Sequence, residues 1–165
     1  MRFILFLTFL IAIFSSNILA QSIEHSDNHD HSGNHDHHKN EIGVANVPVY
    51  FLKEKVFSYG LHIHYVRNIS KSKFGIGLSY ERIFDEHKHK TFGLLLAYRP
   101  IDKLSFSVSP GLTVDADNPE ASFALHLETL YEFEIRNFHI GPVFEFAYDP
   151  EDIHLSLGLH VGYGF

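Results

Sequence analysis

Histidine is the residue type in this sequence with the greatest capacity for chemistry, with 14 copies among 165 residues. Six of them lie near the N-terminus, interleaved with aspartates: His25, His29, His31, His35, His37 and His38. Neutral imidazole together with carboxylate suits Zn²⁺, Ni²⁺ or Cu²⁺, and a flexible segment can wrap such ligands around an ion. The same composition also fits a soluble spacer or a pH-sensitive polyelectrolyte, because composition alone fixes no geometry.

A second set of histidines and carboxylates lies at alternating positions further along the chain. His62 and His64 are two residues apart in a predicted strand, which places both on one face about 6.6 Å apart along the backbone. Other predicted strands add inward-facing residues, namely Glu81, His126, Glu128, Glu145, His154 and His160. These groups could share a metal, or they could satisfy one another by hydrogen bonding without any ion.

From the two sets we predict the following metal ligands: His25, His29, His31, His35, His37, His38, His62, His64, His126, Glu128, Glu145 and His160. His87 and His89 repeat the His-x-His spacing in a predicted outer loop. Arg99 is the main inward-facing cation, and we expect it to pair with Glu132 or Glu134.

The first twenty residues have the pattern of a secretory signal peptide. Arg2 gives a positive start, an apolar run extends from Phe3 to Phe14, and small and polar residues lead to Ala20. The apolar run is shorter than the roughly 20 residues that a spanning helix needs, so we predict cleavage after Ala20. Residues 21–42 have almost nothing to bury, which predicts a disordered His/Asp-rich tail.

From residue 43 onward, apolar and polar residues alternate in segments of about ten residues separated by short polar turns. This pattern predicts eight strands, at about 44–52, 57–66, 74–84, 92–99, 104–114, 123–134, 138–149 and 154–165. The first is the least regular, and Pro110 and Pro142 each remove a ladder donor from a predicted strand. The length suits one domain, which we place at residues 43–165.

The two faces of the predicted strands differ in a way that favours a membrane barrel over a soluble, lipocalin-like one. The polar face is rich in Gly and Ser and poor in Lys, whereas a water-facing sheet carries longer polar side chains. Small residues fit the narrow interior of an eight-stranded barrel. Tyrosines near the ends of the apolar faces suit interfacial girdles. We therefore predict an all-β fold, an eight-stranded antiparallel up-and-down transmembrane β-barrel.

The C-terminal segment Leu157-Gly158-Leu159-His160-Val161-Gly162-Tyr163-Gly164-Phe165 alternates apolar residues and ends on an aromatic one. It resembles the C-terminal signal of bacterial outer-membrane β-barrels, and residues 43–165 are similar in pattern to the small eight-stranded members of that class. The resemblance implies contact with outer-membrane lipid, insertion by the barrel-assembly machinery, and a periplasmic N-terminal tail and C-terminus. The outer loops are short, which argues against a large adhesive or ligand-capturing loop surface.

Composition narrows the choice of function. A net charge of −7 argues against a nucleic-acid partner and permits cations, and the absence of cysteine excludes disulfides. The leading hypothesis is a barrel that binds, buffers or assists the uptake of Zn²⁺ or another divalent transition metal, alone or with a partner transporter. One alternative is a structural protein whose interior His/Glu network only stabilises the fold. Another is a lipid-modifying enzyme, but the Ser and His residues form no recognisable motif, so we expect no catalytic activity.

Overall fold

The computed structural model describes residues 38–116, 120–150 and 152–165. The predicted signal peptide and the predicted tail up to residue 37 lie outside these ranges. No helix in the described part of the chain is long and apolar enough to cross a membrane.

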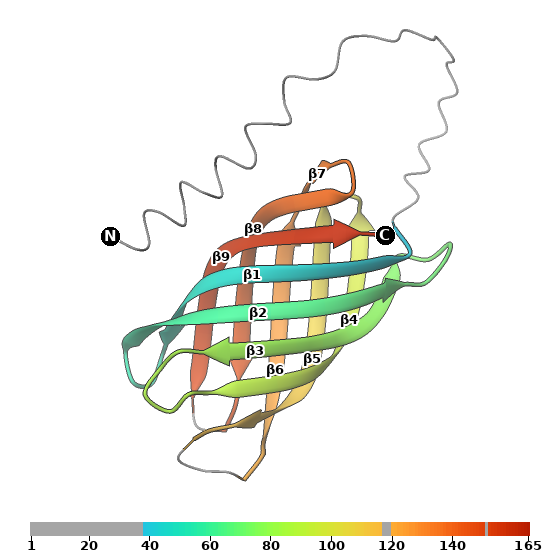
Figure 1. The fold of residues 1–165 in the computed structure, drawn as a ribbon. Coiled ribbons are helices and arrows are strands. Elements are labelled where there is room, and N and C mark those ends of the chain that lie inside the picture. Colours follow the sequence, from blue (N-terminus) through green and yellow to red (C-terminus); the bar gives the residue numbers. More distant parts are fainter. Residues whose placement is uncertain (1–37, 117–119, 151) are drawn as a thin grey trace, which may run out of the picture. The chain divides into compact units, whose positions relative to one another are not determined.

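The described residues form one antiparallel sheet that closes on itself as a barrel (Figure 1). Its strands are β1 (Asn40–Phe51), β2 (Val56–Asn68), β3 (Phe74–Ile83), β4 (Lys90–Ile101), β5 (Leu104–Val114), β6 (Ser122–Tyr131), β7 (Phe133–Ile135), β8 (Phe138–Tyr148) and β9 (Ile153–Gly164). Consecutive strands pair, except that β6 and β7 both pair with β8, and β1 pairs with β9 to close the barrel.

Strands β6 and β7 are two parts of one crossing of the barrel. Leu130 of β6 lies opposite Val143, and Phe133 of β7 lies opposite Ile140, so the register continues unchanged across the break. Pro142, which has no N–H to donate, lies within the interrupted stretch of β8. The barrel therefore has eight crossings, and the predicted eight-stranded antiparallel fold is confirmed.

The apolar face of each strand points outward, as predicted. Among the most exposed side chains are Leu94 at 67%, Leu157 at 64% and Leu78 at 58%, all well inside strands. Gly, Ser, His and Glu residues occupy the buried alternate positions. A soluble barrel would have the opposite arrangement, so this outer surface suits hydrocarbon and not water.

All eight tyrosines of the chain lie on this outer surface, in two groups of four. Near the barrel end that carries both termini of the sheet are Tyr65, Tyr98, Tyr131 and Tyr163. Toward the other end are Tyr50, Tyr59, Tyr80 and Tyr148. Amphipathic aromatic rings at two levels are the expected pattern for a barrel whose apolar belt spans a bilayer.

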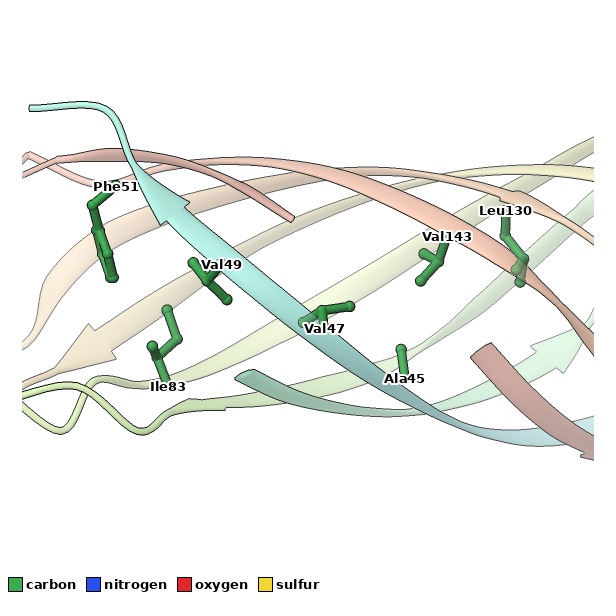
Figure 2. Close-up of a cluster of buried hydrophobic side chains, with 7 residues drawn as sticks. All are labelled: Ala45, Val47, Val49, Phe51, Ile83, Leu130 and Val143. Carbon is green, nitrogen blue, oxygen red and sulfur yellow. The ribbon is translucent and has the colours of Figure 1, made fainter. Parts of the chain in front are cut away.

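The inside of the barrel is filled in part by apolar side chains, and β1 contributes more of them than any other strand. Ala45, Val47, Val49 and Phe51 project from one side of this strand into a buried cluster with Ile83, Leu130 and Val143 (Figure 2). Because Val44 and Ile42 on the other side of β1 are exposed, both faces of the strand are apolar. This explains the weak alternation of the first predicted strand.

Strand β1 begins earlier than the sequence pattern indicates. Its first residue is Asn40, three residues before the predicted start of the barrel at residue 43. Asn40 donates its backbone N–H to the carbonyl of Phe165 at 2.8 Å. Glu41, in a segment expected to bury almost nothing, is only 5% exposed and faces the lumen.

Candidate metal centre

Two clusters of buried polar side chains in the lumen differ in their charged residues. The Arg99 cluster, near the end where β1 begins and β9 ends, consists of Glu41, Asn68, Arg99, Glu132 and His139. The His/Glu cluster consists of His62, His64, Glu81, His126, Glu128, Glu145 and His154. All residues named in the His/Glu cluster are buried.

Five strands position the His/Glu cluster, because each contributes inward-facing residues at the same depth of the lumen. His62 on β2 lies directly opposite Glu81 on β3, and Glu128 on β6 lies directly opposite Glu145 on β8. Two carboxylates facing each other across a strand pair repel, so a positive charge is needed between them. In this structure the neighbouring imidazoles supply the partners: His62 Nδ1 lies 3.1 Å from Glu128 Oε2 and 3.3 Å from Glu145 Oε2.

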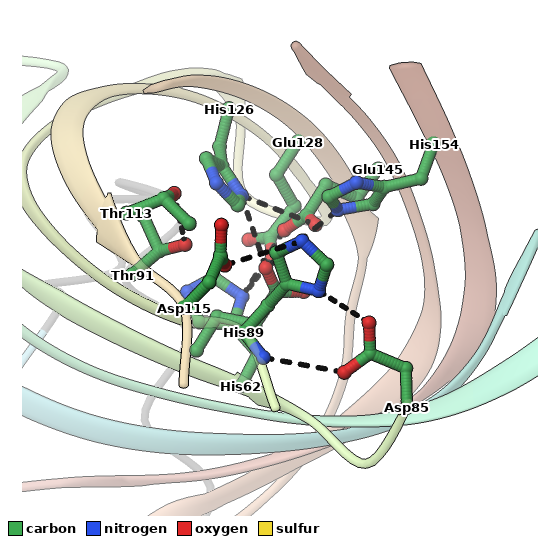
Figure 3. Close-up of polar contacts among 11 residues, drawn as sticks. His62, Asp85, His89, Thr91, Thr113, Asp115, His126, Glu128, Glu145 and His154 are labelled. Atoms are coloured by element: carbon green, nitrogen blue, oxygen red, sulfur yellow. Dashed lines mark hydrogen bonds and ion pairs between the residues drawn. The ribbon is translucent and has the colours of Figure 1, made fainter. Parts of the chain in front are cut away.

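One group within this cluster has the arrangement of a metal site. Glu81, His126, Glu145 and His154 each offer a ligand atom, and these four atoms lie within 4.8 Å of one another. His126 Nδ1 is 3.3 Å from Glu145 Oε1, and His154 Nε2 is 3.6 Å from Glu81 Oε2. Figure 3 shows His126, Glu145 and His154 converging from three strands.

The hydrogen bonding of this group is incomplete in the protein alone. Both carboxylate oxygens of Glu81, both ring nitrogens of His154 and Oε1 of Glu145 are buried without a hydrogen-bond partner. Buried polar atoms are normally satisfied, and an unmade bond on each costs about 1–3 kcal/mol. Two imidazoles and two carboxylates are also a donor set that suits Zn²⁺ and similar divalent ions. The residues therefore fit a metal ion.

A second group lies next to the first. His62, His64 and Glu128 also place ligand atoms within 4.8 Å of one another, and all three are buried. The rings of His62 and His64 have centroids 5.7 Å apart and meet nearly edge to face. Together the two groups bring together the predicted ligands His62, His64, His126, Glu128 and Glu145.

Arg99 is held by several partners, and only some were predicted. Its Nη2 lies 2.5 Å from Glu41 Oε2, and its Nη1 donates to Asn68 Oδ1 at 2.8 Å. Its Nε lies 3.8 Å from Glu132 Oε1, in agreement with one of the two predicted partners. The alternative partner, Glu134, is exposed on β7, and the ion pairs of Arg99 within the described residues are with Glu41 and Glu132.

The predicted ligand His160 is fully buried but is not part of either metal-ligand group in the described structure. Its ring stacks between those of His64 and His139, with centroids 4.9 and 5.2 Å apart. Glycine makes this stack possible, because a Cβ on Gly43 would come within 2.2 Å of His160 Nε2. His160 therefore packs between the two clusters.

Of the tail histidines, His25, His29, His31, His35 and His37 lie outside the described residues, and their role as ligands stays a prediction. His38 is exposed just before β1, and its carbonyl accepts a hydrogen bond from Asn68 Nδ2 at 2.7 Å.

The predicted outer-loop pair of histidines divides between two environments. His87 is partly exposed, with its Nε2 3.7 Å from Glu54 Oε1. His89 turns inward instead, where Nδ1 bonds Asp85 and Nε2 lies 3.2 Å from Asp115 Oδ1 (Figure 3). This His/Asp group ties the β3–β4 loop to the end of β5.

Sequence reasoning placed Glu81 and His154 on the interior face but did not include them among the predicted ligands. It missed Glu41 and left His139 without a role. The alternation pattern signals that His139, Glu81 and His154 face inward, but no local pattern tells which inward residues from non-adjacent strands meet. Glu41 would have been found only by extending the alternation of β1 backwards into the polar segment.

Comparison with known proteins bears on the fold. No protein-family model and no curated protein matches this sequence. Among solved structures, Neisserial surface protein A is similar with a TM-score of 0.52 and 11% identity, covering 76% of this chain and 96% of that one. A de novo designed transmembrane β-barrel has a TM-score of 0.54 and 14% identity, covering 76% and 95%.

The attachment invasion locus protein Ail of Yersinia pestis is similar with a TM-score of 0.50 and 17% identity, covering 76% of this chain and 96% of that one. At these identities the likeness concerns the fold alone. Together with the closed antiparallel sheet and the outward apolar faces, it establishes that this chain has the fold of the small eight-stranded outer-membrane β-barrels.

Proposed function

We propose that this protein is an outer-membrane β-barrel that binds a divalent transition-metal ion, Zn²⁺ or a similar ion, inside its lumen. The observation that carries the proposal is the group Glu81, His126, Glu145 and His154, whose ligand atoms lie within 4.8 Å of one another in a buried site. An ion there would give partners to the buried oxygens of Glu81 and the ring nitrogens of His154.

Placement in the outer membrane is part of this proposal. It is supported by the apolar outer surface, the two levels of tyrosine and the likeness to small outer-membrane barrels. We propose that both termini are periplasmic and that the barrel-assembly machinery inserts the chain. The His/Asp-rich tail would then lie in the periplasm and could capture ions for the barrel, alone or together with a transporter.

The packing of the lumen suits binding of a metal ion better than passage of the ion through the barrel. Apolar side chains such as Val47, Val49 and Phe51 fill part of the interior, and eight-stranded barrels leave only enough room for side chains. We therefore favour binding and buffering of the ion over flow through the barrel.

The competing function is purely structural, and a specific observation favours it. His62 already makes a hydrogen bond with Glu128 at 3.1 Å, so His and Glu side chains in this lumen satisfy one another in part. In that case the same residues would stabilise the barrel and have no affinity for ions.

Calorimetry with Zn²⁺ on the refolded protein separates the two functions. Zn²⁺ binding by the tail should be eliminated by replacing its six histidines with asparagine. A deletion through residue 41 is unsuitable because it would also remove the buried Glu41. We expect binding that survives this replacement and is lost in Glu81→Gln with His154→Gln. His87→Gln, in an outer loop, is the control that should leave binding unchanged.

Heat-modifiable migration on gels verifies that each variant has refolded. If the tail-substituted protein binds no more Zn²⁺ than an unrelated small barrel, the lumen is structural only. If binding survives in the Glu81→Gln/His154→Gln variant, the ion lies elsewhere and the proposed site is wrong.

A further inference from the structure

Glu145 lies at the junction of the two metal-ligand groups. Its Oε1 is 3.3 Å from His126 Nδ1, in the first group, and its Oε2 is 3.3 Å from His62 Nδ1, in the second. The side chain is 3% exposed, so both oxygens lie inside the barrel. A carboxylate whose two oxygens face two different sets of imidazoles has the geometry of a bridge.

If Glu145 is a ligand in both groups, the two groups have the same composition. The first group has His126, His154, Glu81 and Glu145, and the second gains Glu145 to join His62, His64 and Glu128. Each then holds two imidazoles and two carboxylates, which is enough to complete four-coordinate binding of a divalent ion.

The charges in the cluster are compatible with two divalent ions. Three carboxylates, from Glu81, Glu128 and Glu145, lie together, and each of them forms ion pairs with imidazoles. With neutral imidazoles, one divalent ion beside the three carboxylates leaves a net charge of −1, and two divalent ions leave +1, so both are within one charge of neutrality and the arrangement of the ligands decides the number. The direct opposition of Glu128 and Glu145 across β6 and β8 calls for positive charge on both sides of Glu145.

We propose that the His/Glu cluster binds two divalent transition-metal ions side by side, with the carboxylate of Glu145 bridging them. This inference rests on the proposed metal-binding function and specifies its stoichiometry and ligands. Glu81, His126 and His154 complete one ion's shell, and His62, His64 and Glu128 complete the other's. Carboxylate-bridged pairs of this kind hold their ions about 3.5–4 Å apart.

The test counts ions per barrel in the full chain with its six tail histidines replaced by asparagine. After dialysis against Zn²⁺, elemental analysis should give two ions per folded barrel. Glu81→Gln and Glu128→Gln should each leave one ion, because each removes a ligand from a different site. Glu145→Gln should weaken both sites and give fewer than one, and Thr113→Ala, a lumen residue outside the cluster, should retain two.

Paramagnetic Cu²⁺ provides a readout that needs no change in the cluster. With one Cu²⁺ per barrel we expect the ordinary spectrum of an isolated ion, and with two the double-integrated intensity per copper should fall by more than half through coupling between neighbouring ions. Loss of a variant to misfolding would therefore leave the test intact.

The outcomes separate this inference from the proposed function. One Zn²⁺ per barrel would overturn the two-ion centre and leave the metal-binding function standing, whereas no Zn²⁺ would overturn both. Two Cu²⁺ ions with independent spectra, or Glu145→Gln retaining one fully occupied site, would show that Glu145 does not bridge.

Discussion

The two polar clusters of the lumen are built from similar residues but differ in their source of positive charge. In the Arg99 cluster, a guanidinium lies against Glu41 and Glu132 and donates to Asn68. In the His/Glu cluster, carboxylates face imidazoles alone. Arginine is always protonated in proteins, so its carboxylates have a permanent partner. Imidazole can give up its proton, so its carboxylates can exchange that partner for a metal ion.

The difference indicates a division of function between the two clusters. The Arg99 cluster is suited to holding strands together under all conditions, and the His/Glu cluster is suited to a ligand that comes and goes. The following predictions test this division, beginning with the largest expected effect.

Replacing Arg99 should destabilise the fold and leave metal binding unchanged. Arg99→Met keeps much of the side-chain volume but leaves Glu41 and Glu132 buried without their guanidinium partner. Loss of one partner of a buried ion pair costs about 3–5 kcal/mol, so the free energy of unfolding in urea should fall by that amount. Arg99→Lys, which retains the charge, should lose less. If Arg99→Met were as stable as the unsubstituted protein, the Arg99 cluster would have no structural role.

Metal should stabilise the barrel through the His/Glu cluster only. At a free Zn²⁺ concentration 100 times the dissociation constant, the free energy of unfolding should rise by about 2.7 kcal/mol for each site, and chelation should reverse the change. Urea unfolding with and without Zn²⁺ measures this increment. Glu81→Gln should reduce the increment because Glu81 belongs to a metal-ligand group, and Glu132→Gln should retain it. Equal increments in both variants would contradict the division.

Metal affinity should decrease as the pH falls. Binding needs neutral imidazoles, so affinity is greatest where the histidines are unprotonated and is lost as they take up protons, by about tenfold per pH unit for each proton displaced. Calorimetry between pH 5 and 8 on the tail-substituted protein should show this slope. An affinity independent of pH would mean that histidines are not the ligands.

Tight packing near the Arg99 cluster should make Gly162 intolerant of a side chain. A Cβ at this position would lie 1.9 Å from His139 Nε2, so Gly162→Ala should cost about 1–3 kcal/mol through overpacking. The double variant Gly162→Ala/His139→Ala should be more stable than the two separate losses predict, because the clash is gone. Strict additivity of the two losses in urea unfolding would show that the His139 ring is free to move away.

The smallest effect is expected in a turn remote from both clusters. Lys55 has a φ of 58°, a left-handed conformation that costs a residue with a Cβ about 1–2 kcal/mol. Lys55→Gly should relieve this cost and raise the free energy of unfolding by up to about 1 kcal/mol, less the extra entropy of glycine in the unfolded chain. Metal affinity should not change. A decrease in stability would mean that Lys55 makes a stabilising contact larger than its backbone cost.

The sequence was sufficient for most of the fold because a side-chain period of two is a local property. Leu94 and Leu96 could be placed outward, and His62 and His64 inward, from alternation alone. The clusters depend instead on which inward residues meet across the lumen. Glu41 reaches Arg99 from β1 to β4, and His126 meets His154 from β6 to β9, and neither pair is on neighbouring strands. Strand pairing and closure determine these contacts, so no spacing within a segment encodes them.

The bridge between Glu41 and Arg99 has a consequence for how the barrel selects one alignment of its first strand. Ile42, Ala45, Val47 and Val49 make both faces of β1 apolar, so hydrophobicity alone discriminates poorly between the correct alignment and one shifted by a single residue. Such a shift would turn the carboxylate of Glu41 toward lipid and leave Arg99 without it. The buried charge of Glu41 thus destabilises the misaligned strand far more than the surrounding apolar residues do. It therefore helps to specify the alignment in which β1 pairs with β9 and closes the barrel.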